Sequence, residues 1–150
     1  MRLRDLLDSS TVKVSMVSTE KDEAIEELVD VLVRSGRITD REGVIDAIMN
    51  RERQQTTGIG SGVAVPHAKH ESITELTAAL GISKSGIEFD AIDDKPVRVV
   101  FLIMARVDDP GPHIQALAEI ARLLQIPGFY RKMTEAESVA DLLALIESEE

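Results

Sequence analysis

The chain has 150 residues, of which 43% are apolar and 29% are charged, and its formal net charge is −10. This length suits one domain with a sizeable apolar core, and the composition is that of a folded globule rather than a disordered chain. Cysteine is absent, which excludes disulfides, thiolate catalysis, zinc–thiolate sites and iron–sulfur clusters. The excess of carboxylates opposes binding to phosphate backbones, so no nucleic acid partner is expected.

Apolar runs in the chain are short. The longest, Val99–Ala105, has seven residues, whereas a helix that spans a bilayer needs roughly 20. The segment Met1–Asp8 contains neither an extended apolar stretch nor a small-residue cleavage site. We therefore expect a cytoplasmic protein without direct membrane insertion.

The first elements are a short helix and a strand. An apolar helix is expected over residues 2–8. It precedes a half-buried strand, which is predicted because Val12, Val14 and Met16 alternate with polar residues.

Two amphipathic helices follow. Ser18 or Thr19 is expected to cap the first, and Gly36 to end it, because glycine adopts the left-handed conformation readily at a helix C-terminus. Its buried face has helical spacing and consists of Ile25, Leu28, Val29, Leu32 and Val33. Thr39 is expected to cap the second helix, over residues 40–53. One face of this helix carries Val44, Ile45 and Ile48.

The middle of the chain predicts a loop and several strands. Residues 56–62 are expected to form a loop, because three glycines in five positions favour positive φ and oppose a helix. A brief strand over 63–65 would end at Pro66-His67. Alternation predicts a strand at 76–83, and continuous apolarity predicts a strand at 97–105 that is buried on both faces. Turns are expected at 86–90 and 93–96.

The last part predicts two helices. The first starts near His113 and ends at Pro127-Gly128. Its expected buried face consists of Ile114, Leu117, Ile120, Ala121 and Leu124. After a short connecting turn, Ser138 caps the final helix, with Asp141 at its third position. The inward residues of this helix are Val139, Leu142, Leu143 and Ile146. Helices that flank strands in this way predict an α/β fold.

The three histidines are the side chains that titrate nearest neutrality. His67 follows a glycine loop and a proline, a rigid and accessible position that suits a nucleophile. His113 lies in the first turn of a helix, where free N–H groups favour an anion. A structural or solvated role is the alternative for each. A three-histidine zinc site is a further alternative, which the odd spacing of His67 and His70 opposes if that segment is extended.

The glycines at 58–62 match no common catalytic or nucleotide motif. No Lys-Ser or Lys-Thr follows them, so a mononucleotide loop is not indicated. Gly60-Ser61-Gly62 also lacks the spacing of a hydrolase nucleophile elbow.

The segment Arg51–Ala68 resembles the active-site segment of fructose/mannitol-type IIA domains of the bacterial phosphotransferase system, a family that includes a nitrogen-regulatory branch. The resemblance covers nearly the whole chain and continues through Leu6–Leu7, Ile87–Val97, Pro112–Leu117, Ile120–Ala121 and Leu142–Ile146. It implies one free-standing IIA domain over residues 1–150, with a mixed, roughly five-stranded sheet sandwiched between helices.

The resemblance also implies a site. His67 would be the phosphorylated nucleophile, with His113 and Arg51 beside it. The amides of Gly60, Ser61 and Gly62 would add hydrogen-bond donors for the phosphoryl group. At Ser61 the nitrogen-regulatory branch usually has asparagine, although serine can still donate one hydrogen bond. No metal or cofactor is needed for such a transfer, and His70 is expected to be a surface residue.

The function implied is that of a phosphohistidine carrier. It would accept a phosphoryl group on His67 from the histidine phosphocarrier protein and pass it to a IIB domain. The alternative is a regulatory binding module, in which phosphorylation of His67 controls docking to a target protein. A metal-dependent hydrolase would instead require stoichiometric zinc.

Overall fold

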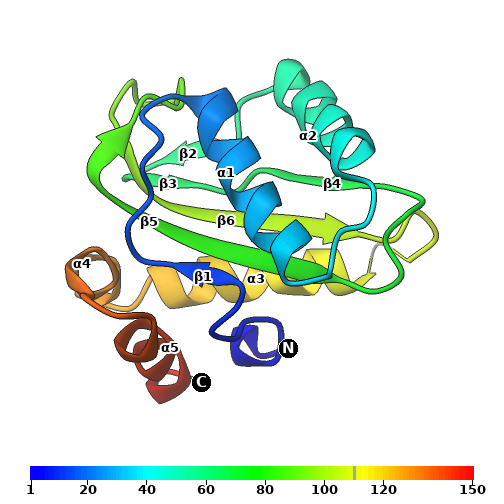
Figure 1. The fold of residues 1–150 in the computed structure, drawn as a ribbon. Helices are drawn as coiled ribbons and strands as arrows, with labels where there is room; N and C mark the ends of the chain where they lie inside the picture. Colours follow the sequence, from blue (N-terminus) through cyan, green and yellow to red (C-terminus); the bar gives the residue numbers. More distant parts are fainter. Residues whose placement is uncertain (110) are drawn as a thin grey trace.

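The computed structural model describes residues 1–109 and 111–150 and contains a six-stranded sheet between two layers of helices (Figure 1). The strands are β1 (Val12–Lys13), β2 (Gly58–Gly60), β3 (Val63–Ala64), β4 (His67–Lys69), β5 (Thr77–Ile87) and β6 (Val97–Ala105). The helices are the short 3-10 turn η1 (Leu3–Asp5), α1 (Lys21–Arg34), α2 (Arg41–Gln54), α3 (Gly111–Leu124), α4 (Phe129–Glu135) and α5 (Val139–Ser148). Within the described residues, no helix combines the length and the apolarity needed to cross a membrane.

The sheet is mixed. β5 and β6 form a long antiparallel pair, β1 runs parallel to β5, β3 and β4 run parallel to β6, and β2 returns antiparallel to β3. The predicted α/β class and the mixed sheet between helices are confirmed, with six strands rather than about five.

The sixth strand arises from an interruption. β3 and β4 pair with β6 in one register, because Val63 is opposite Val99 and His67 is opposite Ile103. Pro66 lies between them and has no N–H to donate to the ladder. This segment is therefore divided into two short strands, of which β3 lies between β6 and β2.

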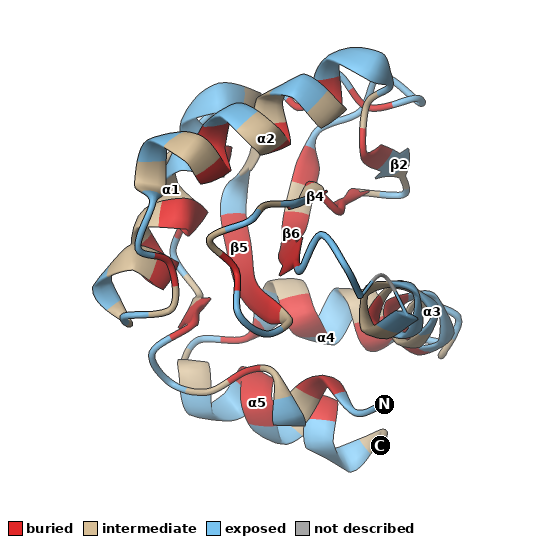
Figure 2. Cartoon of the chain, turned by 90° about the vertical axis from the view of Figure 1, so that its right-hand side faces the viewer, coloured by how far each residue is buried: buried red, intermediate tan, exposed pale blue. Residues whose placement is uncertain are grey.

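Apolar side chains fill both sides of the sheet. The helices α1 and α2 cover one face, and α3, α4, α5 and η1 cover the other (Figure 1). Side chains of β6 alternate between the two cores: Val100, Leu102 and Met104 face α1 and α2, whereas Val99, Phe101 and Ile103 face the other layer. Figure 2 shows the buried residues of the helices on their inner sides. Strand 97–105 is thus buried on both faces, as predicted.

The start of α1 is displaced from its predicted cap. The helix begins at Lys21, with Glu20 at the N-cap position and no side-chain cap, instead of Ser18 or Thr19. The preceding residues are held extended, because the C=O of Thr19 accepts the N–H of Glu88 (2.8 Å) and the N–H of Lys21 donates to the C=O of Glu88 (3.0 Å). Strand-like pairing with a distant segment therefore overrides the local capping signal.

Other helix ends lie close to their predicted positions. Asp40, one residue after the expected Thr39, caps α2 and accepts a main-chain N–H of the first turn at 3.0 Å. Gly36 has φ of +80° just after α1, as expected of a helix stop. Ser138 caps α5 by accepting the N–H of Asp141 (3.0 Å), which confirms that prediction.

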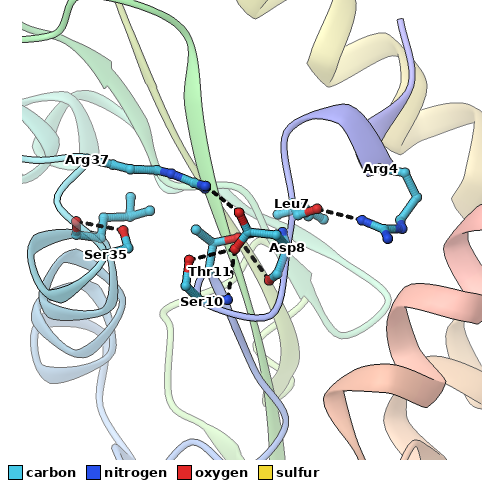
Figure 3. A network of polar contacts seen from close by, with 8 residues as sticks. Arg4, Leu7, Asp8, Ser10, Thr11, Ser35 and Arg37 are labelled. Atoms are coloured by element: carbon cyan, nitrogen blue, oxygen red, sulfur yellow. Dashed lines mark hydrogen bonds and ion pairs between the residues drawn. The ribbon is translucent and has the colours of Figure 1, made fainter.

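The helix expected over residues 2–8 is reduced to the single 3-10 turn η1. After it the chain turns sharply at Asp8, whose carboxylate accepts the N–H (2.8 Å) and the hydroxyl (2.6 Å) of Ser10 and pairs with Arg37 (Figure 3). The hydrogen bond from Ser10, together with Arg37, lowers the pKa of Asp8 to about 2. These contacts direct the chain into β1.

The glycine-rich residues 56–62 are a hairpin rather than a loop. β2 and β3 are joined by Ser61-Gly62, both with positive φ (56° and 82°), as a two-residue hairpin turn requires. A Cβ atom on Gly62 would lie 2.0 Å from the hydroxyl oxygen of Tyr130. Glycine is therefore required at position 62 for both conformation and space.

The C-terminal part differs from its prediction in two respects. The buried residues of α3 are Ala116, Ile120 and Leu123. Of the five residues expected to be buried there, Ile114 and Ala121 are exposed and Leu117 and Leu124 are half-buried. The buried face is therefore rotated from the expected one toward Ala116 and Leu123, while Ile120 is common to both. The connecting turn expected before α5 contains the additional helix α4, which buries Phe129 and Met133.

A pair of substitutions in α3 tests this orientation. Ile120 is 2% exposed, whereas Ile114 is 62% exposed. Ile120→Ala should lower the free energy of unfolding by about 2–5 kcal/mol, because it leaves a cavity in the core. Ile114→Ala should change it by less than about 0.5 kcal/mol. Urea denaturation followed by circular dichroism measures both, and equal losses would contradict the orientation of α3.

Candidate phosphoryl-transfer site

His67 is the first residue of β4, directly after the interruption that separates β3 from β4. Its Nδ1 lies 2.7 Å from the C=O of Val65. Because a carbonyl oxygen only accepts hydrogen bonds, Nδ1 carries the proton and Nε2 keeps its lone pair. The local backbone thus selects the imidazole tautomer in which Nε2 is the nucleophile.

His113, in the first turn of α3, lies beside His67. The two ring centroids are 4.8 Å apart and the ring planes are tilted by 41°. The Nε2 atom of His113 is buried and has no hydrogen-bond partner among the described residues. A buried polar atom without a partner is uncommon in a native structure. The ring of His113 therefore has a hydrogen-bonding nitrogen that the described residues leave unused.

Arg51 lies in the last turn of α2 and shares a cavity of about 320 Å³ with His67. Its Nη1 donates to the C=O of Gln55 at 2.9 Å, which holds the side chain back over its own helix end. The remaining wall of the cavity includes Thr56, Thr57, Ile59, Val65, Leu117, Ile120 and Ala121. No carboxylate belongs to this wall, as far as residues 1–109 and 111–150 define it. The cavity therefore combines an imidazole, a fixed cation and an apolar surface.

Burial dominates the titration of both imidazoles. It lowers the pKa of His67, an effect that the nearby Arg51 charge reinforces, whereas the hydrogen bond to Val65 and the charge of Glu52 oppose it. Burial also lowers the pKa of His113, and the charges of His67, Lys69 and Arg51 act in the same direction. Both rings are consequently neutral at neutral pH.

The glycine-rich turn does not reach this site. The C=O of Gly62 accepts the N–H of Val99, whereas His67 is opposite Ile103, and four residues of strand span about 13 Å. The N–H of Ser61 already donates to the carboxylate of Asp93 (3.0 Å). The structure thus brings His67, His113 and Arg51 together but leaves the predicted phosphate ligands Gly60, Ser61 and Gly62 at the far end of the hairpin.

His70 is not the simple surface residue expected. Its side chain is only 17% exposed. Nδ1 accepts the N–H of Ser72 at 3.1 Å and lies 2.7 Å from the Ser72 hydroxyl, while Nε2 lies 3.7 Å from the Asp40 carboxylate. The residue therefore links the segment after β4 to the start of α2. The described part of the chain contains no group of three or more His, Asp or Glu that could hold a metal ion.

Glu52, which lies next to Arg51 and is 7% exposed, is a buried residue of the site region for which the sequence predicted no role. Its carboxylate accepts both the N–H and the hydroxyl of Thr57, each at 2.7 Å. A signal for this burial exists in the sequence, because Glu52 continues the inward stripe of Ile45 and Ile48 at helical spacing. A carboxylate on an apolar stripe indicates a specific buried partner.

Comparison with known proteins identifies the family of the chain. A family model described as "Phosphoenolpyruvate-dependent sugar phosphotransferase system, EIIA 2" matches residues 5–149. The chain is 39% identical over 149 residues to the fructose-specific EIIA component of Haloferax volcanii, covering 93% of this chain and 97% of that protein. It is 37% identical over 146 residues to the fructose-specific EIIABC component of Bacillus subtilis, covering 97% of this chain but only 23% of that longer protein.

Solved structures show the same fold. The nitrogen regulatory protein IIA-Ntr of Neisseria meningitidis superposes with a TM-score of 0.88 at 25% identity, covering 96% of this chain and 98% of that one. The mannitol IIA protein of Escherichia coli, solved in complex with phosphorylated mannitol IIB, superposes with a TM-score of 0.82 at 23% identity, covering 95% of this chain and 97% of that one. The chain therefore belongs to the EIIA 2 family of the phosphoenolpyruvate-dependent sugar phosphotransferase system.

Proposed function

We propose that this protein is a phosphohistidine carrier that accepts a phosphoryl group on His67 from the histidine phosphocarrier protein and passes it to a IIB domain. One observation carries the proposal: a neutral imidazole, held in the tautomer with a free Nε2, lies in a cavity with Arg51 and beside His113. An exposed lone pair and surrounding donors are what phosphoryl transfer between two histidines needs.

The transfer balances without any further reactant. The Nε2 lone pair of His67 attacks phosphorus, and the P–N bond to the donor histidine breaks with its electron pair remaining on the donor nitrogen. His67 keeps its Nδ1 proton, so its ring gains positive charge. The C=O of Val65, which accepts that proton's hydrogen bond at 2.7 Å, stabilises the charged ring.

His113 and Arg51 would stabilise the phosphoryl oxygens during transfer. The unpartnered Nε2 of His113 would donate to one oxygen in the tautomer that carries its proton there. The guanidinium of Arg51 supplies a permanent charge and a planar set of donors. A phosphoryl group brings roughly −1.5 to −2 charges. A cavity wall without carboxylates is therefore suited to it.

A second function, control of a target protein by the phosphorylation state of His67, is supported by the likeness to a nitrogen regulatory protein at a TM-score of 0.88. Both functions use the same histidine. Purified IIB proteins separate them: rapid onward transfer favours transport, whereas binding that depends on phosphorylation without any IIB acceptor favours regulation.

His67→Ala should abolish phosphorylation by phosphoenolpyruvate and the two general phosphotransferase proteins, because it removes the nucleophile. The label on the unaltered protein should be acid-labile and base-stable, as expected of a phosphoramidate. His70→Ala is the matched control and should retain the label, since His70 faces Asp40 and Ser72. Label that persists on folded His67→Ala would place the acceptor elsewhere.

Separate His113→Ala and Arg51→Ala substitutions should each slow the single-turnover transfer to His67 by a factor on the order of 10² to 10³, as is typical when a donor to the transition state is removed. Arg53→Ala is the control for Arg51, because Arg53 lies on the same helix but is exposed and donates to Asn50. Unchanged rates in both site variants would remove these residues from the site.

The rate of phosphorylation should be constant across the neutral range and fall only below pH 6.5. The neutral imidazole is the nucleophile, and burial lowers the pKa of His67 below its ordinary value of 6.5. Protonation should therefore remove the nucleophile only at a pH below 6.5. An NMR titration of the imidazole nitrogens, beside single-turnover rates at each pH, measures both quantities. A midpoint at or above 6.5 would contradict the burial argument.

A further inference from the structure

Glu52 is a buried carboxylate whose contacts are Thr57 and Lys21. Its side chain is 4% exposed, and it accepts two hydrogen bonds of 2.7 Å from Thr57. The ammonium of Lys21, on α1, lies 3.5 Å away and compensates part of its charge. Burying a carboxylate is costly unless such partners are present. The arrangement therefore fixes Thr57 firmly relative to the end of α2.

From Thr57 a line of hydrogen bonds continues to the nucleophile. The C=O of Thr57 accepts the N–H of Val65 at 2.9 Å. The C=O of Val65 in turn accepts the Nδ1–H of His67 at 2.7 Å. Two residues, Thr57 and Val65, thus separate the carboxylate of Glu52 from the imidazole, and each hydrogen bond in the line is of normal length.

The same carboxylate also holds the segment that contains the hydrogen-bond acceptor of Arg51. The segment from Glu52 to Thr57 is closed into a loop by the Glu52–Thr57 bonds. Within that loop the C=O of Gln55 accepts a hydrogen bond from the Arg51 guanidinium (2.9 Å). Movement of the loop would shift both the acceptor of Arg51 and the strand residue that orients His67.

We propose that Glu52 is a positioning residue of the transfer site, which holds His67 in the Nδ1–H tautomer through Thr57 and Val65 and steadies Arg51 through the loop it closes. This inference rests on the proposed role of His67 as the phosphoryl acceptor. Glu52 touches no reacting atom. The effect of Glu52 is to keep the Nε2 atom of His67 unprotonated and directed into the cavity. A hydrogen bond at one ring nitrogen of a histidine generally selects the tautomer and the orientation of the ring in this way.

The negative charge of Glu52 also affects the titration of His67, independently of the hydrogen bonds. The charge of Glu52 raises the pKa of His67 and so opposes the lowering by burial. Replacing the carboxylate with a neutral amide should therefore lower the pKa of His67 further. A residue that only stabilised the fold would affect neither the tautomer nor this titration.

Glu52→Gln in the full chain is the decisive variant, because the amide keeps the size of the side chain but loses one of the two acceptors. Nitrogen-15 NMR of the unphosphorylated protein should show a smaller fraction of the Nδ1–H tautomer at His67, a shifted Val65 amide signal and a lower His67 pKa. Single-turnover phosphorylation should slow by on the order of 10-fold.

Glu42→Gln is the control, since Glu42 lies on the same helix with a side chain that is 77% exposed. This substitution should change neither the tautomer nor the pKa of His67, nor the Val65 signal, nor the rate.

If Glu52→Gln does not fold, Thr57→Val tests the positioning role of Glu52 instead. It retains the N–H bond to Glu52 and the C=O bond to Val65 but removes the hydroxyl bond. The same shifts are expected with smaller size. A folded variant with unchanged tautomer, His67 pKa and rate would overturn the inference. The NMR measurements need no phosphoryl donor, so they remain decisive even if His67 proves not to be phosphorylated, which would overturn the proposed function instead.

Discussion

The site depends on the parallel pairing of one interrupted segment, β3 and β4, with β6. Val63 and His67 keep the same offset from their partners Val99 and Ile103, so the chain stays in register across Val65 and Pro66. The interruption frees the C=O of Val65 from the ladder and allows it to accept the Nδ1–H of His67. Since β6 is buried on both faces, this pairing holds the backbone of His67 against a strand of the core.

The electrostatics of the site contrast with those of the whole chain. The formal net charge is −10, yet within the described residues the cavity at His67 is bounded by Arg51, Gln55 and apolar or hydroxyl side chains. The carboxylate of Glu52, the residue after Arg51, is buried and is engaged by Thr57 and Lys21. Buried position and hydrogen bonding thus keep negative charge away from the surface that would meet a phosphorylated partner.

Local patterns predicted those elements whose determinants lie within a few residues. The inward stripe of α1 was identified by spacing, with Leu28 and Leu32 fully buried, and the end of this helix by Gly36. Ser138 caps α5 through a hydrogen bond within its own first turn. The predicted start of α1 was wrong because Glu88, from a distant segment, holds the residues before the helix in an extended conformation. Local propensity is overridden wherever such non-local pairing is stronger.

The sequence by itself determined the fold class, the main helices and strands, and the family likeness that singled out His67, His113 and Arg51. Only the tertiary structure decided which face of α3 is buried, that His67 and His113 lie 4.8 Å apart, and that the glycine turn lies away from them. It also connected Glu52 to His67. Hydrophobic periodicity reports on neighbours along one element, whereas strand register and helix rotation are set by packing between elements that are distant in the chain.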